Sequence, residues 1–183
     1  YGKNIWVNYE QSLELHLETA EVAYLCGDAL QLTLLIKSVL GNARSTIDIS
    51  RAYEIQVRFL ISNHKLEEAV DIGTDALTSL SIDLSPISHP RTVLKLILVL
   101  VHSYRLSRRK KIILEPMTHK GRLAAMKLLM LMCHAAYLDG DTKVSRYILE
   151  MAYISLKFGM APESSFAYPM LGSALISYLG TIN

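Results

Sequence analysis

Five basic side chains stand within seven positions of the sequence and form its most concentrated charge. They are Arg105, Arg108, Arg109, Lys110 and Lys111, in a chain with 19 lysines and arginines and a net charge of +2. Such a cluster could dock an acidic partner or nucleotide phosphates, and a solvated loop between helices is the alternative. No aromatic side chain stands between these charges to stack on bases, so we expect no nucleic-acid partner.

A second polar group has helical spacing. Arg51, Glu54 and Arg58 stand at offsets 0, 3 and 7 and therefore share one helix face. On a helix that lines the inner side of a superhelix, this face could recognise a peptide or another domain. The alternative is a network in which charges three and four positions apart neutralise each other.

Signatures of catalysis are missing from the sequence. It contains no GxxxxGK[ST] or GxGxxG loop for phosphates, no HExxH and no GxSxG. No two of its six histidines stand three or four positions apart, so the spacing of metal ligands on a helix is also missing. We therefore expect no catalytic, cofactor-binding or metal-binding residue, and no cofactor.

Composition favours a folded helical protein. Of the 183 residues, 51% are apolar and 20% are charged, which excludes a disordered chain. The richest apolar run, Val93 to Val101, contains Lys95 and is far shorter than the roughly 20 residues of a membrane span, so no span is expected. Cys26 and Cys133 belong to no CxxC motif, which favours reduced thiols and a cytoplasmic location.

Apolar residues recur at helical spacing along almost the whole chain. Between Leu66 and Leu80, for example, the apolar or small positions fall at offsets 0, 3, 4, 7, 10, 11 and 14. Asp28 is a suitable N-cap for the helix that follows it. The pattern predicts an all-α fold with eight helices, at residues 8–26, 29–44, 47–62, 65–81, 91–106, 120–138, 142–158 and 162–180, and a short helical turn near 108–114.

An internal repeat organises these helices. The segment Val22–Asp28 (VAYLCGD) recurs as Ala135–Asp141 (AAYLDGD), and their glycines, Gly27 and Gly140, are 113 residues apart. This separation is three periods of about 38 residues, and hairpins of paired helices with a small residue and a glycine turn are typical of tetratricopeptide-like (TPR-like) repeats. We therefore predict a right-handed superhelix of antiparallel helical hairpins, an α-solenoid. A generic helical bundle is the alternative.

The repeat also predicts how the hairpins follow each other. One turn is expected at residues 63–65 and the next near 103–107, where the basic, proline-containing segment would shorten the second helix of the third hairpin. The whole chain, 1–183, is expected to form one repeat domain with a weaker sub-boundary near 81–91. Because the sequence begins at Tyr1 and stops within a repeat, we expect it to be part of a longer chain. We also expect residues 1–183 by themselves to self-associate through the apolar residues of 166–180.

Several short sequence motifs in the second half of the chain occur together in one known family. They are Glu115–Thr118, Leu123–Leu129, Ala135–Leu138, Ser155–Gly159 and Pro162–Tyr168. In this order and spacing they resemble the TPR-like helical segment of large bacterial and fungal signalling proteins. In those proteins a protein-kinase-like domain and a STAND-type ATPase precede the helices, and a GAF domain and a histidine kinase or another output domain often follow. Pro169, which is unusual for this stretch, departs from the family pattern and predicts a kink.

The resemblance implies a function without catalysis in this segment. The family's ATP-binding and phosphotransfer motifs lie in its other domains, and none of them occurs here. We therefore expect a protein–protein interaction and regulatory module that relays state between the nucleotide switch and the output domain, with neighbouring domains or another protein as partners. A sensor domain that binds a small effector is the alternative, and an independent enzyme is the least favoured function.

Overall fold

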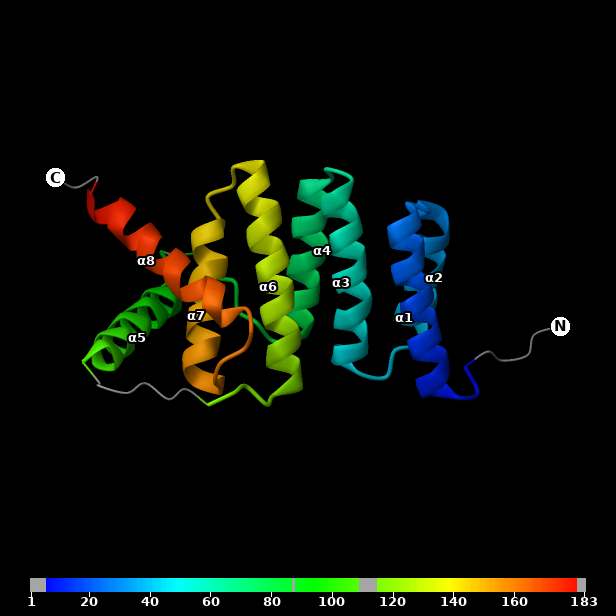
Figure 1. Cartoon of the computed structure of the whole chain (residues 1–183), viewed down its shortest axis with the longest axis horizontal. Helices are drawn as coiled ribbons and strands as arrows, with labels where there is room; N and C mark the ends of the chain where they lie inside the picture. Colours follow the sequence, from blue (N-terminus) through cyan, green and yellow to red (C-terminus); the bar gives the residue numbers. More distant parts are fainter. Residues whose placement is uncertain (1–5, 87, 109–114, 181–183) are drawn as a thin grey trace.

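The computed structural model describes residues 6–86, 88–108 and 115–180, and this part of the chain is built from helices (Figure 1). Its only β-type pairing is an isolated parallel bridge between Pro116 and Met160. The all-α prediction is therefore confirmed. The helices are α1 (Tyr9–Cys26), α2 (Ala29–Asn42), α3 (Thr46–Ser62), α4 (Leu66–Ser79), α5 (Pro90–Ser107), α6 (Lys120–Asp139), α7 (Val144–Phe158) and α8 (Ser164–Gly180).

Local signals in the sequence set the ends of the helices. The side chain of Asp28 accepts a hydrogen bond of 2.9 Å from the backbone N–H of Gln31 and caps α2, as predicted. Gly27 and Gly140 end α1 and α6 in the left-handed conformation, with φ of 73° and 70°. Each of the eight predicted helices is present, and no predicted end is more than two residues from the observed one.

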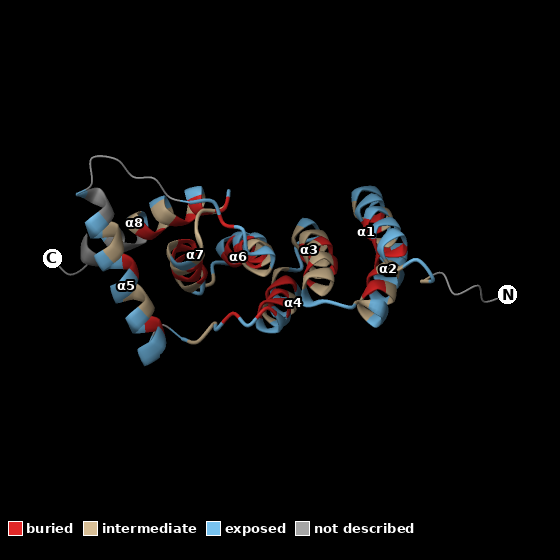
Figure 2. Ribbon diagram, turned by 90° about the horizontal axis from the view of Figure 1, so that it is seen from below, coloured by how far each residue is buried: buried red, intermediate tan, exposed pale blue. Residues whose placement is uncertain are grey.

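The order in which the helices pack differs from the predicted succession of hairpins. The pairs α1–α2, α3–α4 and α6–α7 pack against each other, and α6 also packs directly on α3 and α4. The third hairpin is therefore α6–α7, while α5 leaves the row and packs against α7 at the end that also holds α8 (Figures 1 and 2). The prediction that α5 forms the third hairpin, with its turn near 103–107, is therefore wrong. The short turn expected at 108–114 falls almost entirely outside the described residues.

A glycine allows α6 to take the place next to α4. A Cβ atom at Gly73 would lie 2.8 Å from Cγ and Sδ of Met132, closer than side chains tolerate. Met132 itself is fully buried. The missing side chain at Gly73 therefore lets α4 and α6 approach each other around the methionine.

The apolar core has two parts that meet in α3. The smaller part joins α1 and α2 to Ala52 and Ile55, and the larger part joins Val57 and Leu60 to the helices from α4 to α8. Ile82 also belongs to the larger part, so the segment between α4 and α5 is packed against the core.

One buried ion pair attaches α5 to α7. The ammonium group of Lys95 lies 2.6 Å from Oε2 of Glu150, and both side chains are shielded, with 13% and 8% of their surface exposed. Lys95 also donates a hydrogen bond of 3.1 Å to the backbone carbonyl of Asp83. Beside this pair, Val99 is the fully buried apolar contact of α5.

Candidate functional site

One face of the molecule, made by α1, α3, α6 and the start of α8, carries two adjoining hollows. Glu54, Arg58, Lys127 and Glu163 line both of them. The hollow toward α8, which we name the apolar groove, has a volume of about 590 Å³. The hollow toward α1, which we name the charged groove, has a volume of about 670 Å³.

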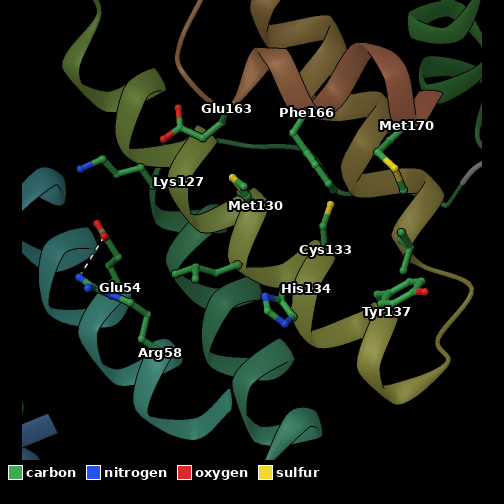
Figure 3. A pocket seen from close by; sticks show the side chains of 12 residues that line it. Glu54, Arg58, Lys127, Met130, Cys133, His134, Tyr137, Glu163, Phe166 and Met170 are labelled. Atoms are coloured by element: carbon green, nitrogen blue, oxygen red, sulfur yellow. Dashed lines mark hydrogen bonds and ion pairs between the residues drawn. The ribbon is translucent and has the colours of Figure 1, made fainter. Parts of the chain in front are cut away.

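The apolar groove is lined mainly by α6 and α8. Phe166 points from α8 toward α6, and Met170 lies one helical turn farther along α8 (Figure 3). Met130 of α6 is 40% exposed, whereas Met126, Met132 and Met151 are fully buried core residues. The remaining lining residues of this groove are Leu131, Cys133, His134, Tyr137 and Val144. Methionine and aromatic side chains at an open surface can adapt to different apolar ligands.

The charged groove contains ion pairs between α1 and α3. Arg51 holds Glu14 with two hydrogen bonds, Nη1 to Oε1 at 2.5 Å and Nη2 to Oε2 at 2.7 Å. Hydrogen bonding to Arg51 lowers the pKa of Glu14. Arg58 lies 3.2 Å from Glu21 and 3.1 Å from Glu54, so the predicted neutralising network along α3 exists only between Arg58 and Glu54.

Both pairs between α1 and α3 join residues that are separated by the same distance in the sequence. Arg51 follows Glu14 by 37 residues, and Arg58 follows Glu21 by the same distance. The shift of 113 residues from Gly27 to Gly140 likewise carries Glu14 to Lys127. The positions of Glu14, Arg51 and Lys127 therefore form one row across α1, α3 and α6.

A second row ends in the apolar groove. The shift of 113 residues carries Glu21 to His134, so Glu21, Arg58 and His134 hold equivalent positions on the same three helices. Sequence reasoning singled out the α3 members, and the same shift would have found Lys127 and His134.

Glu163 closes this face where α8 begins. Its Oε2 atom is buried and has no hydrogen-bond partner among the described residues, and the same holds for Nε of Arg58. Both side chains line both grooves. A bound polar group could satisfy them, since buried polar atoms without partners are costly.

The predicted basic cluster lies elsewhere. Arg105 and Arg108 are exposed at the end of α5, and the guanidinium of Arg108 stacks on the ring of Tyr104 at 4.8 Å. Neither residue lines either groove. Arg109, Lys110 and Lys111 lie outside the described residues. The two predicted sites are therefore separate surfaces.

Cys133 illustrates how closed the floor of the apolar groove is. Only 2% of its surface is exposed, and burial raises the pKa of its thiol to about 12. Cys26 is exposed. Because the thiolate is the reactive form, we expect Ellman's reagent to modify Cys26 rapidly and Cys133 only after unfolding.

The matched variant for this prediction is Cys26→Ser. It should lose the rapid reaction and keep one thiol that appears in denaturant. Rapid labelling of Cys133 in the folded variant would show that α6 opens at this point.

Within the described ranges, no three histidine, cysteine, aspartate or glutamate side chains are placed to hold a metal ion. None of the described helices is long and apolar enough to cross a membrane. No family profile, curated protein or solved structure matches the chain. The resemblance to TPR-like segments of signalling proteins thus stays a prediction from the sequence.

Proposed function

We propose that the chain is a non-catalytic interaction module that binds a segment of a neighbouring domain or of another protein in its apolar groove. The observation that carries this proposal is the groove itself, where an exposed methionine, Met130, and the aromatic ring of Phe166 adjoin charged side chains with unsatisfied buried atoms. Apolar side chains of a partner would fill the groove, and polar groups of its backbone would reach Glu163 and Arg58.

The groove also supports a regulatory role. Its walls come from α3, α6 and α8, so an occupant would contact helices that are far apart in the sequence. Binding would then favour one packing of these helices over another, which is how a ligand shifts a conformational equilibrium. As part of a multidomain signalling ATPase or kinase, the module would relay state between a nucleotide switch and an output domain.

A selection with random peptides tests the proposal. We expect peptides selected from a phage-displayed random library to bind the unchanged chain and to lose at least about tenfold in affinity for Met130→Glu, a change of about 1.4 kcal/mol. The matched control is Leu138→Glu, because Leu138 lies on the same helix, is 50% exposed and does not line the groove. Fluorescence anisotropy measures both. Equal binding to the two variants, or no enriched peptide, contradicts the proposal.

A small-effector sensor is the second candidate, because about 590 Å³ falls within the 300–1,000 Å³ range of small-molecule sites. An effector present at about 100 times its dissociation constant would add about 2.7 kcal/mol of stability. A thermal-shift screen with metabolites distinguishes the two candidates. Met130→Glu should abolish the stabilisation by any effector that binds in the groove.

A further inference from the structure

Helix α5 is oriented with its more apolar side toward solvent. Seven large apolar side chains of α5 are between 40% and 59% exposed, and we name them the α5 face: Val93, Leu94, Ile97, Leu98, Leu100, Val101 and Tyr104. The side that packs on the rest of the molecule carries Thr92, Lys95, Leu96 and Val99. Amphipathic helices of globular proteins normally bury the apolar stripe, so the α5 face is suited to a further contact.

The charged residues that α5 itself carries have one sign, although Asp83, before the helix, lies near Arg91 and Lys95. Residues 84–108 contain Arg91, Lys95, Arg105 and Arg108 and no aspartate or glutamate. Lys95 is paired with Glu150, whereas the three arginines are exposed. A complementary surface must therefore be apolar and acidic.

The opposite end of the molecule has these properties. The hairpin α1–α2 has five apolar side chains that are between 57% and 78% exposed: Leu15, Val22, Leu25, Leu30 and Leu34. We name this surface the acidic end, because acidic residues stand among these five in the sequence. Leu15 and Val22 are seven residues apart with Glu18 between them, so all three lie on one stripe of α1. Residues 6–43 contain five acidic residues and one basic residue, Lys37. Glu14 and Glu21 are neutralised by Arg51 and Arg58 of α3, so the acidic excess of this end comes from Glu10, Glu18 and Asp28.

The two surfaces lie at opposite ends of the long axis, with α5 at one end and α1–α2 at the other (Figure 1). A contact between two α5 faces would bring arginines together, and a contact between two acidic ends would bring glutamates together. Only the mixed pairing joins opposite charges, and both of its partners are apolar.

We propose that the α5 face of one copy of the chain docks on the acidic end of a second copy. The contact is heterologous, because each copy contributes a different surface. A complex of two copies keeps one free surface of each kind, so further copies can add head to tail.

The size of the α5 face predicts a modest affinity. The face consists of seven large side chains that are each about half exposed, which is comparable to the largest single patches on monomers, about 300–600 Å². A stable interface buries about 800 Å² on each partner. Association should therefore rise with protein concentration, and added salt should weaken it because the flanking charges are exposed.

Two double variants test the proposal, each blocking one surface. Ile97→Asp with Val101→Asp places two charges on the α5 face, and Leu15→Lys with Val22→Lys places two on the acidic end. By sedimentation velocity, we expect the unchanged chain to grow beyond a dimer with concentration and each variant alone to stay monomeric. Mixed in equal amounts, the two variants should form a complex of one copy of each, since each retains the surface that the other lacks.

Matched controls add the same charge away from both surfaces. Thr78→Asp with Thr142→Asp changes the net charge by as much as the variant of the α5 face. Asp75→Lys changes it by as much as the variant of the acidic end. All three positions are exposed. Both controls should associate like the unchanged chain. Far-ultraviolet circular dichroism verifies that all variants are folded, and formation of the mixed complex verifies it independently.

Other results would overturn the proposal. A strict monomer at hundreds of micromolar excludes docking between copies. A variant that still associates alone indicates a symmetric contact through its unchanged surface. Two folded variants that stay monomeric when mixed exclude direct docking of the α5 face on the acidic end. Binding of the monomer to phosphatidylserine vesicles, lost in Ile97→Asp with Val101→Asp, would assign the α5 face to a lipid surface.

Discussion

We expect the Lys95→Met variant to lose about 3–5 kcal/mol of unfolding free energy at neutral pH, because it leaves the buried carboxylate of Glu150 without its partner. Glu150 has 8% of its side chain exposed and lies 2.6 Å from Lys95. Methionine keeps most of the length and apolar surface of lysine. The loss therefore reports the missing charge rather than missing volume, and urea unfolding measures it.

The loss should depend on pH. Burial raises the pKa of Glu150, and the hydrogen bond from Lys95 opposes this rise. Among the neighbouring charges, Asp83 raises the pKa and Arg122 lowers it. Without Lys95 the pKa of Glu150 in the folded state rises further above that of the unfolded chain, which is about 4.3. The penalty is therefore absent below that value, grows as the pH rises from it to the folded-state pKa, and is constant at higher pH.

The control is the double variant Lys95→Met with Glu150→Met, which removes both charges. It should recover most of the lost stability, because buried ion pairs replaced by apolar side chains are often neutral in energy. An equal loss in Lys95→Met at every pH would show that contacts of the lysine, such as its hydrogen bond to Asp83, matter more than the charge of Glu150.

The helices could be predicted from the sequence because their signals are local. The apolar spacing from Leu66 to Leu80 and the cap at Asp28 act within a few turns. The position of α5 could not be predicted in this way. Its apolar stripe fits any apolar neighbour, and its attachment to α7 depends on Lys95 and Glu150, which are 55 residues apart. The sequence pattern therefore identified the helix but not its place.

The candidate site was predictable only in part, because its local spacing is visible in the sequence and its pairing between helices is not. The spacing of Arg51, Glu54 and Arg58 identifies a shared face, but it does not reveal that Arg51 pairs with α1 instead of Glu54. That pairing has the same separation of 37 residues as the pair of Glu21 and Arg58, which is close to the predicted period of about 38. Glu163 belongs to no repeated row, so only the packing of α8 on the other helices identifies it.

The predicted self-association through 166–180 concerns a segment whose first part is packed on the core. Phe166, Tyr168 and Met170 are half-buried against the main core, and Leu171 is buried. Farther along, Ile176 is 74% exposed. Among the side chains that the structure describes at this end of the molecule, the uncovered apolar surface therefore lies mainly on α5. A contact through the end of α8 stays a prediction.

We expect the Gly159→Ala variant to lose about 3–5 kcal/mol of unfolding free energy, from backbone strain together with a steric clash. Gly159 has φ of 98° and ψ of 179°, a conformation that is essentially restricted to glycine. A Cβ atom there would lie 2.7 Å from the backbone oxygen of Glu115. That oxygen accepts a hydrogen bond of 2.7 Å from the N–H of Met160, so it cannot move away without weakening the bridge beside it.

The matched control is Gly140→Ala, which also has a positive φ, 70°, but has no atom within 4 Å of the added Cβ. Its loss should be about 1–2 kcal/mol, the cost of the left-handed conformation alone. Gly41→Ala, within α2 and in open space, should instead gain about 0.5–1 kcal/mol. Equal losses for Gly159→Ala and Gly140→Ala would mean that residues 115–117 yield to the new methyl group. The contact between this segment and Gly159 and Met160, which precede α8, would then contribute little to the fold. The wall of the apolar groove that α8 provides would then depend on the packing of α8 against α7 alone.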